Sequence, residues 1–207
     1  LHYQIVTAYD SVTGKTWVYG GGTQGYLATY NPGTDTWESF GDEYNGMQQY
    51  GEPGGGSIYP TGCIDTTKRR LYAIGQGRCK YWDITGTGTI LASATSTTGP
   101  QAIQDAQAPG IAYDPISECI IGWCGGSAIY SLNTTTHVWT QITLDGSNSV
   151  TPTSAETNGT YGRFRYSPTS DVFVGVNRTT ENVYIFKLNA GSASLTLLRN
   201  HKTIRMG

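Results

Sequence analysis

Two arginines in the last quarter of the chain are spaced so that they could act together on an anion. Arg163 and Arg165 are two residues apart, so on a β-strand their side chains would share one face. A pair of guanidinium groups can grip a carboxylate, such as that of a uronic acid. The same pair can instead donate hydrogen bonds to backbone carbonyls at the rim of a channel. The sequence leaves both roles open.

The segment from Gly41 to Gly56 combines aromatic rings with side-chain amides, because it contains Tyr44, Gln48, Gln49 and Tyr50. Aromatic rings stack on the apolar faces of pyranoses, while amides form hydrogen bonds with sugar hydroxyls. The same composition suits the recognition of a protein surface. We therefore predict a ligand-binding loop here, for a glycan or for a partner protein.

Three aspartates occur at equivalent places, each directly after a short apolar stretch: Asp10, Asp65 and Asp114. Aligned carboxylates could form a ring around a metal ion. An aspartate at the start of a turn also accepts hydrogen bonds from the backbone two residues further on, and Gly14 in the first of these turns tolerates a positive φ. We interpret the three aspartates as repeated turn residues and expect no metal.

Cysteine and histidine do not indicate a metal, redox or cofactor site. Of the cysteines, only Cys79 and Cys124 are placed so that they could pair, and we expect buried thiols throughout; the other two are Cys63 and Cys119. The histidines are scattered at positions 2, 137 and 201. No Ser/His/Asp arrangement is visible. A carboxylate pair for glycoside hydrolysis, assembled from distant loops, stays open.

Three Asn-x-Ser/Thr sequons begin at Asn133, Asn158 and Asn177. All three fall in expected loops, where N-glycosylation is physically feasible.

These residues belong to a chain that is built from one repeated unit. Copies of the unit can be aligned at Tyr9, Ile64, Tyr113 and Tyr166, about 50 residues apart. Each copy contains short apolar strands that are separated by turns rich in Gly, Asp, Thr and Pro. Four short strands per repeat of this length are typical of the blades of a β-propeller.

We therefore predict an all-β fold, a β-propeller of four blades with four antiparallel strands each. The blades cover approximately residues 1–41, 57–92, 108–145 and 160–200, and no segment has the period of a helix. Among the expected strands are Thr89–Leu91 and Gly162–Tyr166. The ring either closes with four blades or forms part of a larger or multi-chain ring.

The repeats resemble the kelch motif, in which a glycine doublet, a Tyr and a Trp follow one another. The first repeat has Gly20-Gly21-Gly22, Tyr30 and Trp37, and the third has Gly125-Gly126, Tyr130 and Trp139. The second and fourth repeats are degenerate. The resemblance covers nearly the whole chain and implies a propeller, but kelch-like propellers include oxidases, lectin-like modules and interaction scaffolds. The copper ligands of the oxidase branch are absent.

The expected fold places the candidate residues on one side of the ring. Loops between successive blades, and between the second and third strands of each blade, emerge on the same face, and three of them are long. Long loops on one side are usually functional. We predict that the site on this face comprises Tyr44, Gln48, Gln49, Tyr50, Arg78, Asp105, Tyr161, Arg163, Arg165 and Arg178. The first strand of each blade should line a central channel, with Ala8, Cys63, Ala112 and Arg165 at one position.

Composition limits the partners. The net charge of −2 gives no electrostatic case for nucleic acid, and no apolar run is long enough to insert into a membrane. Charged residues make up only 14% of the chain, and Thr, Ser and Asn are abundant, which is typical of an extracellular surface. We expect a secreted protein, either a piece of a larger extracellular protein or a chain that self-associates through blade edges.

We therefore predict an extracellular recognition module that binds a glycan or a partner protein through the long-loop face. Two alternatives remain. The first is a carbohydrate-active enzyme, a lyase, hydrolase or oxidase-like propeller, with its site on the same face. The second is a structural subunit of an extracellular assembly.

Overall fold

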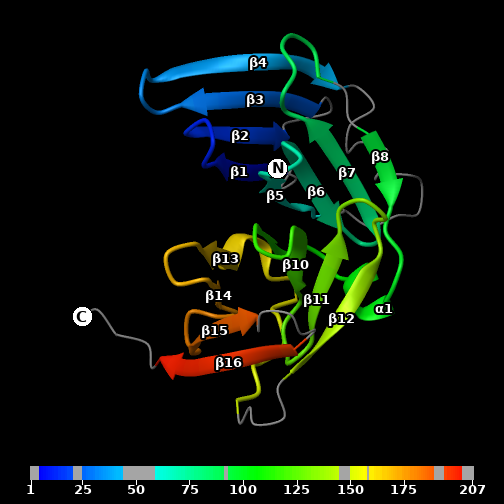
Figure 1. The fold of residues 1–207 in the computed structure, drawn as a ribbon, viewed down its shortest axis with the longest axis vertical. Helices are drawn as coiled ribbons and strands as arrows, with labels where there is room; N and C mark the ends of the chain where they lie inside the picture. Colours follow the sequence, from blue (N-terminus) through cyan, green and yellow to red (C-terminus); the bar gives the residue numbers. More distant parts are fainter. Residues whose placement is uncertain are drawn as a thin grey trace.

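The computed structural model describes residues 5–20, 25–43, 59–90, 93–144, 150–157, 159–188 and 194–201. Four antiparallel sheets follow one another along the chain and fan out around a common axis (Figure 1). The chain is a four-bladed β-propeller, as predicted from the repeat. Among the described residues, no helix has the length and apolar character needed to cross a bilayer.

Each blade has four strands in sequence order, from the axis outward. Blade 1 contains β1 (Val6–Asp10), β2 (Lys15–Gly20), β3 (Gly25–Asn31) and β4 (Thr36–Glu43). Blade 2 contains β5 (Thr61–Asp65), β6 (Arg70–Gly75), β7 (Arg78–Asp83) and β8 (Ser93–Ser96). Blade 3 contains β9 (Gly110–Asp114), β10 (Cys119–Trp123), β11 (Ile129–Asn133) and β12 (Trp139–Leu144). Blade 4 contains β13 (Phe164–Ser167), β14 (Val172–Gly175), β15 (Val183–Leu188) and β16 (Ser194–His201).

Two predicted strands are placed differently, and one helical turn was not expected. The fourth strand of blade 2 is β8, which begins at Ser93, after the predicted Thr89–Leu91. The predicted strand Gly162–Tyr166 begins only at Phe164, because Tyr161–Arg163 form a 3-10 turn, η2. The described residues contain one α-helix, α1 (Gln101–Gln104), which is too short to leave a helical period in the sequence.

Neighbouring blades pack face to face, and in each contact the same side of one blade meets the opposite side of the next. We call the side of a blade that meets the next blade its forward face, and the opposite side its back face. Alternate residues of a strand point to opposite faces, so the forward face of blade 1 carries Trp17 and Tyr19, and the ring of Tyr19 meets Trp82 on the back face of blade 2 at 4.5 Å. Two further apolar clusters fill the contacts between blades 2 and 3 and between blades 3 and 4.

The ring is open between blade 4 and blade 1. Within the described chain, apolar clusters join blade 1 to blade 2, blade 2 to blade 3, and blade 3 to blade 4, and none joins blade 4 to blade 1. Figure 1 shows the four sheets following one another from above the axis, past its right-hand side, to below it, with no sheet on the left between β1–β4 and β13–β16. The outer strands of blades 3 and 4 meet as well, because Thr143 and Leu144 pair in parallel with β16.

The turn between the first and second strands has the same conformation in every blade. The carboxylate of Asp10 accepts hydrogen bonds from the backbone N–H of Val12 at 3.0 Å, and Asp65 and Asp114 do the same for the residues two positions on. The residue four positions after each aspartate has a positive φ, and it is glycine only in blade 1. The aspartates are therefore turn residues, as predicted.

The positive φ shared by these turns leads to a testable prediction about backbone strain. Gly14 has φ +70° with open space where a Cβ would be, whereas Glu118 at the equivalent place has φ +53°. Because a left-handed conformation costs a residue with a Cβ about 1–2 kcal/mol, Gly14→Ala should destabilise the protein by about 1 kcal/mol. Glu118→Gly should instead stabilise the protein, because glycine adopts this conformation without strain. The gain should be a few tenths of a kcal/mol at most, because glycine loses more backbone entropy on folding. Urea denaturation of both variants checks the signs, and equal signs would contradict the argument.

Candidate functional site

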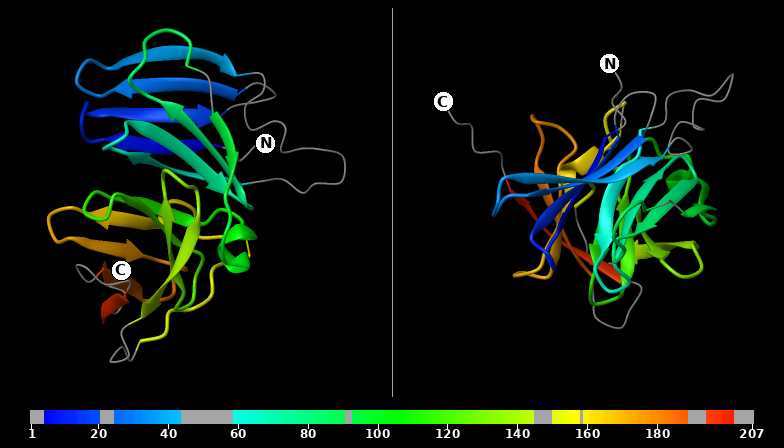
Figure 2. Two further views of the ribbon diagram at one scale, coloured as in Figure 1. Left: turned by 45° about the vertical axis from the view of Figure 1, so that its right-hand side comes forward. Right: turned by 90° about the horizontal axis from the view of Figure 1, so that it is seen from above.

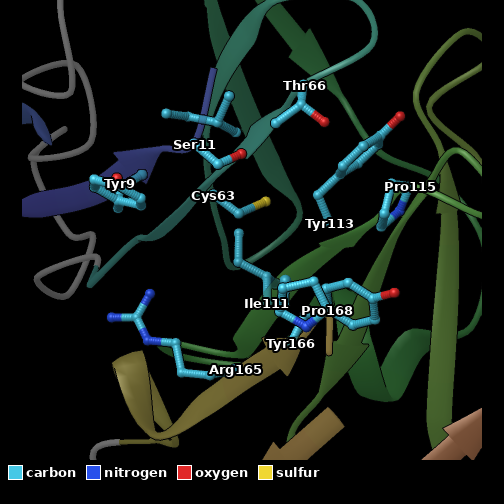
Figure 3. A pocket seen from close by; sticks show the side chains of 13 residues that line it. Tyr9, Ser11, Cys63, Thr66, Ile111, Tyr113, Pro115, Arg165, Tyr166 and Pro168 are labelled. Carbon is cyan, nitrogen blue, oxygen red and sulfur yellow. The ribbon is translucent and has the colours of Figure 1, made fainter. Parts of the chain in front are cut away.

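A cavity of about 350 Å³ lies at the axis, where the first strands of all four blades meet. One position on these strands supplies Ala8, Cys63, Ala112 and Arg165, and all four line the cavity. The prediction that this position faces a central channel is therefore confirmed. The cavity opens among the turns that follow β1, β5, β9 and β13, because Ser11, Thr66, Pro115 and Pro168 also line it (Figure 3). Its volume falls in the range of small-molecule sites.

The wall of this cavity is mainly aromatic and aliphatic. Tyr9, Tyr113 and Tyr166 occupy the same position in three blades and border the cavity. Burial raises the pKa of Tyr113 and of Tyr166 to about 12. Their hydroxyls therefore stay protonated and donate, at 2.8 Å to the hydroxyl of Thr67 and at 3.0 Å to the carboxylate of Asp171. The rings, rather than the hydroxyls, are the surfaces left for a ligand.

Arg165 supplies the positive charge of the cavity. It lies on β13 and is exposed, and among the described residues it has no hydrogen-bond or ion-pair partner. Gly162 leaves room for its guanidinium, because a Cβ at that glycine would lie 2.9 Å from Nη2 of Arg165. Figure 3 shows the side chain at the edge of the cavity, across from Tyr113. An unpartnered guanidinium beside apolar walls is suited to a ligand carboxylate.

A smaller cavity of about 60 Å³ lies at the opposite end of the axis. Tyr161, Thr61 and Arg165 line it, together with residues at the start of β1. Arg165 therefore lines both cavities, and it links the turn side of the channel with the long-loop side on which we predicted the site. Tyr161 also places its ring against Tyr59, with the ring centroids 6.4 Å apart.

The thiol of Cys63 lies in the wall of the larger cavity but is poorly suited to nucleophilic chemistry. Burial raises its pKa well above the usual range, and the nearby titratable groups of Cys79 and Asp65 act in the same direction. Burial likewise raises the pKa of Cys79 to about 12. All four cysteines are free thiols, so Cys79 and Cys124 do not form a disulfide. Cys63 and Cys79 are buried as expected, whereas Cys119 and Cys124 are partly exposed.

The second arginine of the predicted pair has a different environment. Arg163 lies in η2 rather than on the strand, and its guanidinium donates to the carbonyl of Gly159 at 2.7 Å and to that of Val176 at 3.2 Å. Because its donors are used on the backbone, Arg163 holds the loop before blade 4 and lines neither of the two cavities. The two guanidinium groups therefore do not form one binding site for a carboxylate.

The other predicted site residues that the structure describes are dispersed over the loop side. The guanidinium of Arg178 forms an ion pair with Glu156 at 2.9 Å. Asp105 follows α1 and accepts a hydrogen bond from Gln101 at 2.6 Å. Arg78 is exposed at the start of β7. None of these three side chains lines either of the two cavities at the axis.

Tyr44, Gln48, Gln49 and Tyr50 lie outside the described residues, as does the sequon asparagine Asn158. Their role stays a prediction.

The other two sequon asparagines have different environments. Asn133 is exposed at the end of β11, and its side-chain oxygen accepts from the backbone of Thr135 at 2.8 Å. Asn177 is fully buried, and its Nδ2 donates to the carbonyl of Thr153 at 2.5 Å. In the folded chain that nitrogen is not accessible to a glycosyltransferase.

The sequence interpretation missed the turn-side mouth of the channel, because these turns were taken as plain connectors. A signal was present: a tyrosine directly precedes the turn aspartate or serine in three of the four repeats. The described part of the chain gathers no three His, Cys, Asp or Glu side chains placed to hold a metal ion.

Fold and cavity together define the class of protein: a β-propeller with a ligand-sized cavity on its axis. No family model matches the sequence, and no curated protein matches it. Solved propeller structures do match. A chain in the crystal structure of a nidogen–laminin complex is 10% identical with a TM-score of 0.55, and the match covers 91% of this chain and 61% of that one.

Two other solved structures give the same result. A putative 6-phosphogluconolactonase from Bacteroides uniformis is 11% identical, with a TM-score of 0.54 over 93% of this chain and 52% of that one. The major Malassezia sympodialis allergen Mala s 1 is 14% identical, with a TM-score of 0.53 over 95% of this chain and 78% of that one. The chain therefore spans only part of the length of these structures, and the likeness shows the propeller fold alone.

Proposed function

We propose that this propeller is an extracellular recognition module whose glycan ligand places a carboxylate at Arg165. The observation that carries the proposal is the guanidinium of Arg165, which has no ion-pair partner among the described residues and lies beside an apolar, tyrosine-lined cavity of about 350 Å³. A uronic acid fits this chemistry, because its ring has apolar faces that pack on tyrosine rings and its carboxylate pairs with a guanidinium.

The predicted loop-face residues extend this site. Arg165 and Tyr161 share the smaller cavity at the loop-side end of the channel, so the guanidinium of Arg165 borders the long-loop side as well as the larger cavity. A surface poor in charge and an exposed sequon at Asn133 support an extracellular location.

A kelch origin of the repeats belongs to the same proposal. Gly125 and Gly126 both have positive φ, and a Cβ at Gly125 would meet the backbone of Ala155 at 2.1 Å. The glycine doublet is therefore needed where the loop before blade 4 crosses the end of β10. Trp139 is buried at the start of β12, in the place that the motif assigns to a Trp.

Binding suits the described lining of the cavity better than hydrolysis does. The described residues that line the cavity include no carboxylate and no imidazole, whereas glycoside hydrolysis uses two carboxylates flanking the bond that breaks. An enzymatic role would require such groups from another part of the chain.

We expect a screen of the intact protein on a glycan array to select glycans that contain uronic acids. Calorimetry with glucuronate and with glucose then isolates the carboxylate: glucuronate should bind, and Arg165→Met should weaken its binding at least about tenfold, because a charge-assisted pair is lost. Lys187→Met is the control, since it removes an exposed positive charge on β15 and should leave the affinity unchanged. Equal binding of glucuronate and glucose, or an unchanged affinity in Arg165→Met, would refute the site.

A further inference from the structure

Blade 1 exposes a back face whose counterparts in the other blades are covered. The position before the turn is Tyr9 in blade 1, Ile64 in blade 2 and Tyr113 in blade 3. Tyr9 is 63% exposed, whereas Ile64 and Tyr113 are 5% and 7% exposed. The difference arises because blades 2 and 3 each have a preceding blade against this face, whereas no described residue packs a blade against the back face of blade 1.

Two tryptophans at equivalent positions differ in exposure in the same way. Trp37 pairs with Tyr30 on β3, and Trp139 pairs with Leu132 at the same register in blade 3. Trp139 is 2% exposed because blade 2 covers it, while Trp37 is 65% exposed. The ring of Trp37 lies 5.1 Å from that of Tyr30, so the exposed back face of blade 1 is an aromatic surface. A contiguous apolar surface of this kind marks an interaction site.

Blade 4 has the complementary open surface, its forward face. Val174 and Ile185 are paired on this face, and both are half-buried. The position of Val174 corresponds to Trp17 in blade 1 and Ile121 in blade 3, both of which are buried under the next blade. Blade 4 therefore exposes Val174 and Ile185 at the place where each of the other three blades packs against its successor, and the exposed side chains of Arg165 and Lys187 border them on the same face.

The chain makes this forward-to-back contact three times internally, and one polar contact shows its register. The hydroxyl of Tyr113 on blade 3 donates at 2.8 Å to Thr67 in the first turn of blade 2. The equivalent residues at the two open ends are Tyr9 on blade 1 and Thr169 in the first turn of blade 4. Both are exposed, so the donor and the acceptor of a fourth such contact are present at opposite ends of the arc.

We propose that a second copy of this chain docks its blade 4 forward face on the back face of blade 1. The occupant is a second copy because the chain itself carries both halves of the contact. The ring is open on the side where the two faces lie (Figure 2). Two reciprocal contacts join two copies under a two-fold axis and leave neither face in water, whereas a single contact would leave one of each exposed.

The test is the mass of the intact chain in solution, measured by light scattering across a dilution series. The unaltered protein is expected at twice the 22.3 kDa of one chain. Trp37→Glu should shift it to the monomer mass, because a charge is placed in an apolar contact. Ile116→Glu is the matched control: Ile116 is as exposed as Trp37 but lies in a turn outside both open faces, and this variant should keep the dimer mass. Circular dichroism of each variant checks that it is folded.

A second experiment identifies the partner face. Val174→Glu should also give monomers, although it lies in the last blade and far from Trp37 in the sequence. When the Trp37→Glu and Val174→Glu proteins are mixed, each retains the face that the other lacks, so one intact contact forms and a mixed dimer should appear. An unaltered protein that is monomeric at every concentration overturns the proposal. So does a Val174→Glu variant that stays dimeric, which would mean that blade 1 pairs with blade 1.

Discussion

Replacing Trp123 with alanine is expected to lower the free energy of unfolding by about 3–5 kcal/mol, the range for a large buried aromatic residue. Trp123 is fully buried between blades 3 and 4, and its ring lies 5.8 Å from Phe164 and 5.1 Å from Phe186. Its indole N–H also donates to the carbonyl of Gly126 at 2.9 Å. The substitution therefore removes apolar contact on both blades and one hydrogen bond. Urea denaturation, followed by near-ultraviolet circular dichroism, measures the loss.

A neighbouring glycine supplies the control for this prediction. A Cβ at Gly175 would lie 2.5 Å from the ring of Trp123, so Gly175→Ala should destabilise the protein by about 1–3 kcal/mol through overpacking. In a Trp123→Phe background the smaller ring relieves the clash, and the same alanine should cost less. A double-mutant cycle measures this coupling. Strictly additive effects would show that the two residues do not share the contact.

The contact at Trp123 also shows what the sequence could and could not predict. The repeat around Tyr9, Ile64, Tyr113 and Tyr166 was sufficient to predict four blades, because strand pairing follows from short-range turns and alternating apolar residues. Position on the innermost strand was sufficient to place Arg165 in the channel. The alternation of residues along a strand says which side chains share a face, but it does not say whether another blade covers that face.

The role of the arginine pair and the start of the strand at Gly162 could not be predicted for a related reason: of the two roles left open for the pair, Arg163 takes the one of donating to backbone carbonyls. Arg163 and Arg165 are spaced for one strand face, yet η2 takes the first of them out of the strand, and two backbone carbonyls take its donors. A three-residue turn has no periodic pattern, so spacing alone cannot reveal it. The cavity mouth was missed because it forms only when turns from four separate repeats converge on the axis.

The contact between blades 1 and 2 also contains a buried ion pair with a large expected effect. The carboxylate of Asp10 is fully buried and accepts from both terminal nitrogens of Arg69, at 2.7 and 2.5 Å. It also accepts from the hydroxyl of Thr13 at 2.6 Å. Burial alone would raise the pKa of Asp10, but the hydrogen bonds from Arg69, Thr13 and Val12 and the charge of Arg69 lower it to about 2.

The sign of the resulting pH dependence follows from this lowered pKa. In the unfolded chain the carboxyl has its ordinary value of 3.8, so the folded state holds its proton more weakly. The ion pair therefore contributes its full stability above about pH 4 and loses it as the pH falls toward 2, by about 2 kcal/mol at 1.36 kcal/mol per unit. Arg69 keeps its charge throughout this range, because the bonds to Asp10 raise its pKa.

Asp10→Asn is accordingly expected to cost about 3 kcal/mol at pH 7, because it leaves the guanidinium of Arg69 partly buried without its counter-charge. The variant should also lose the fall in stability between pH 4 and 2, which denaturation at several pH values measures. Glu38→Gln is the matched control, since it breaks the exposed pair with Lys15 at 3.0 Å and should cost less than about 1 kcal/mol. Adding Arg69→Met to Asp10→Asn should recover part of the loss, because no unpaired charge then remains between the blades. If the single variant kept the same pH profile as the unaltered protein, the acid sensitivity would have to originate from a different carboxylate.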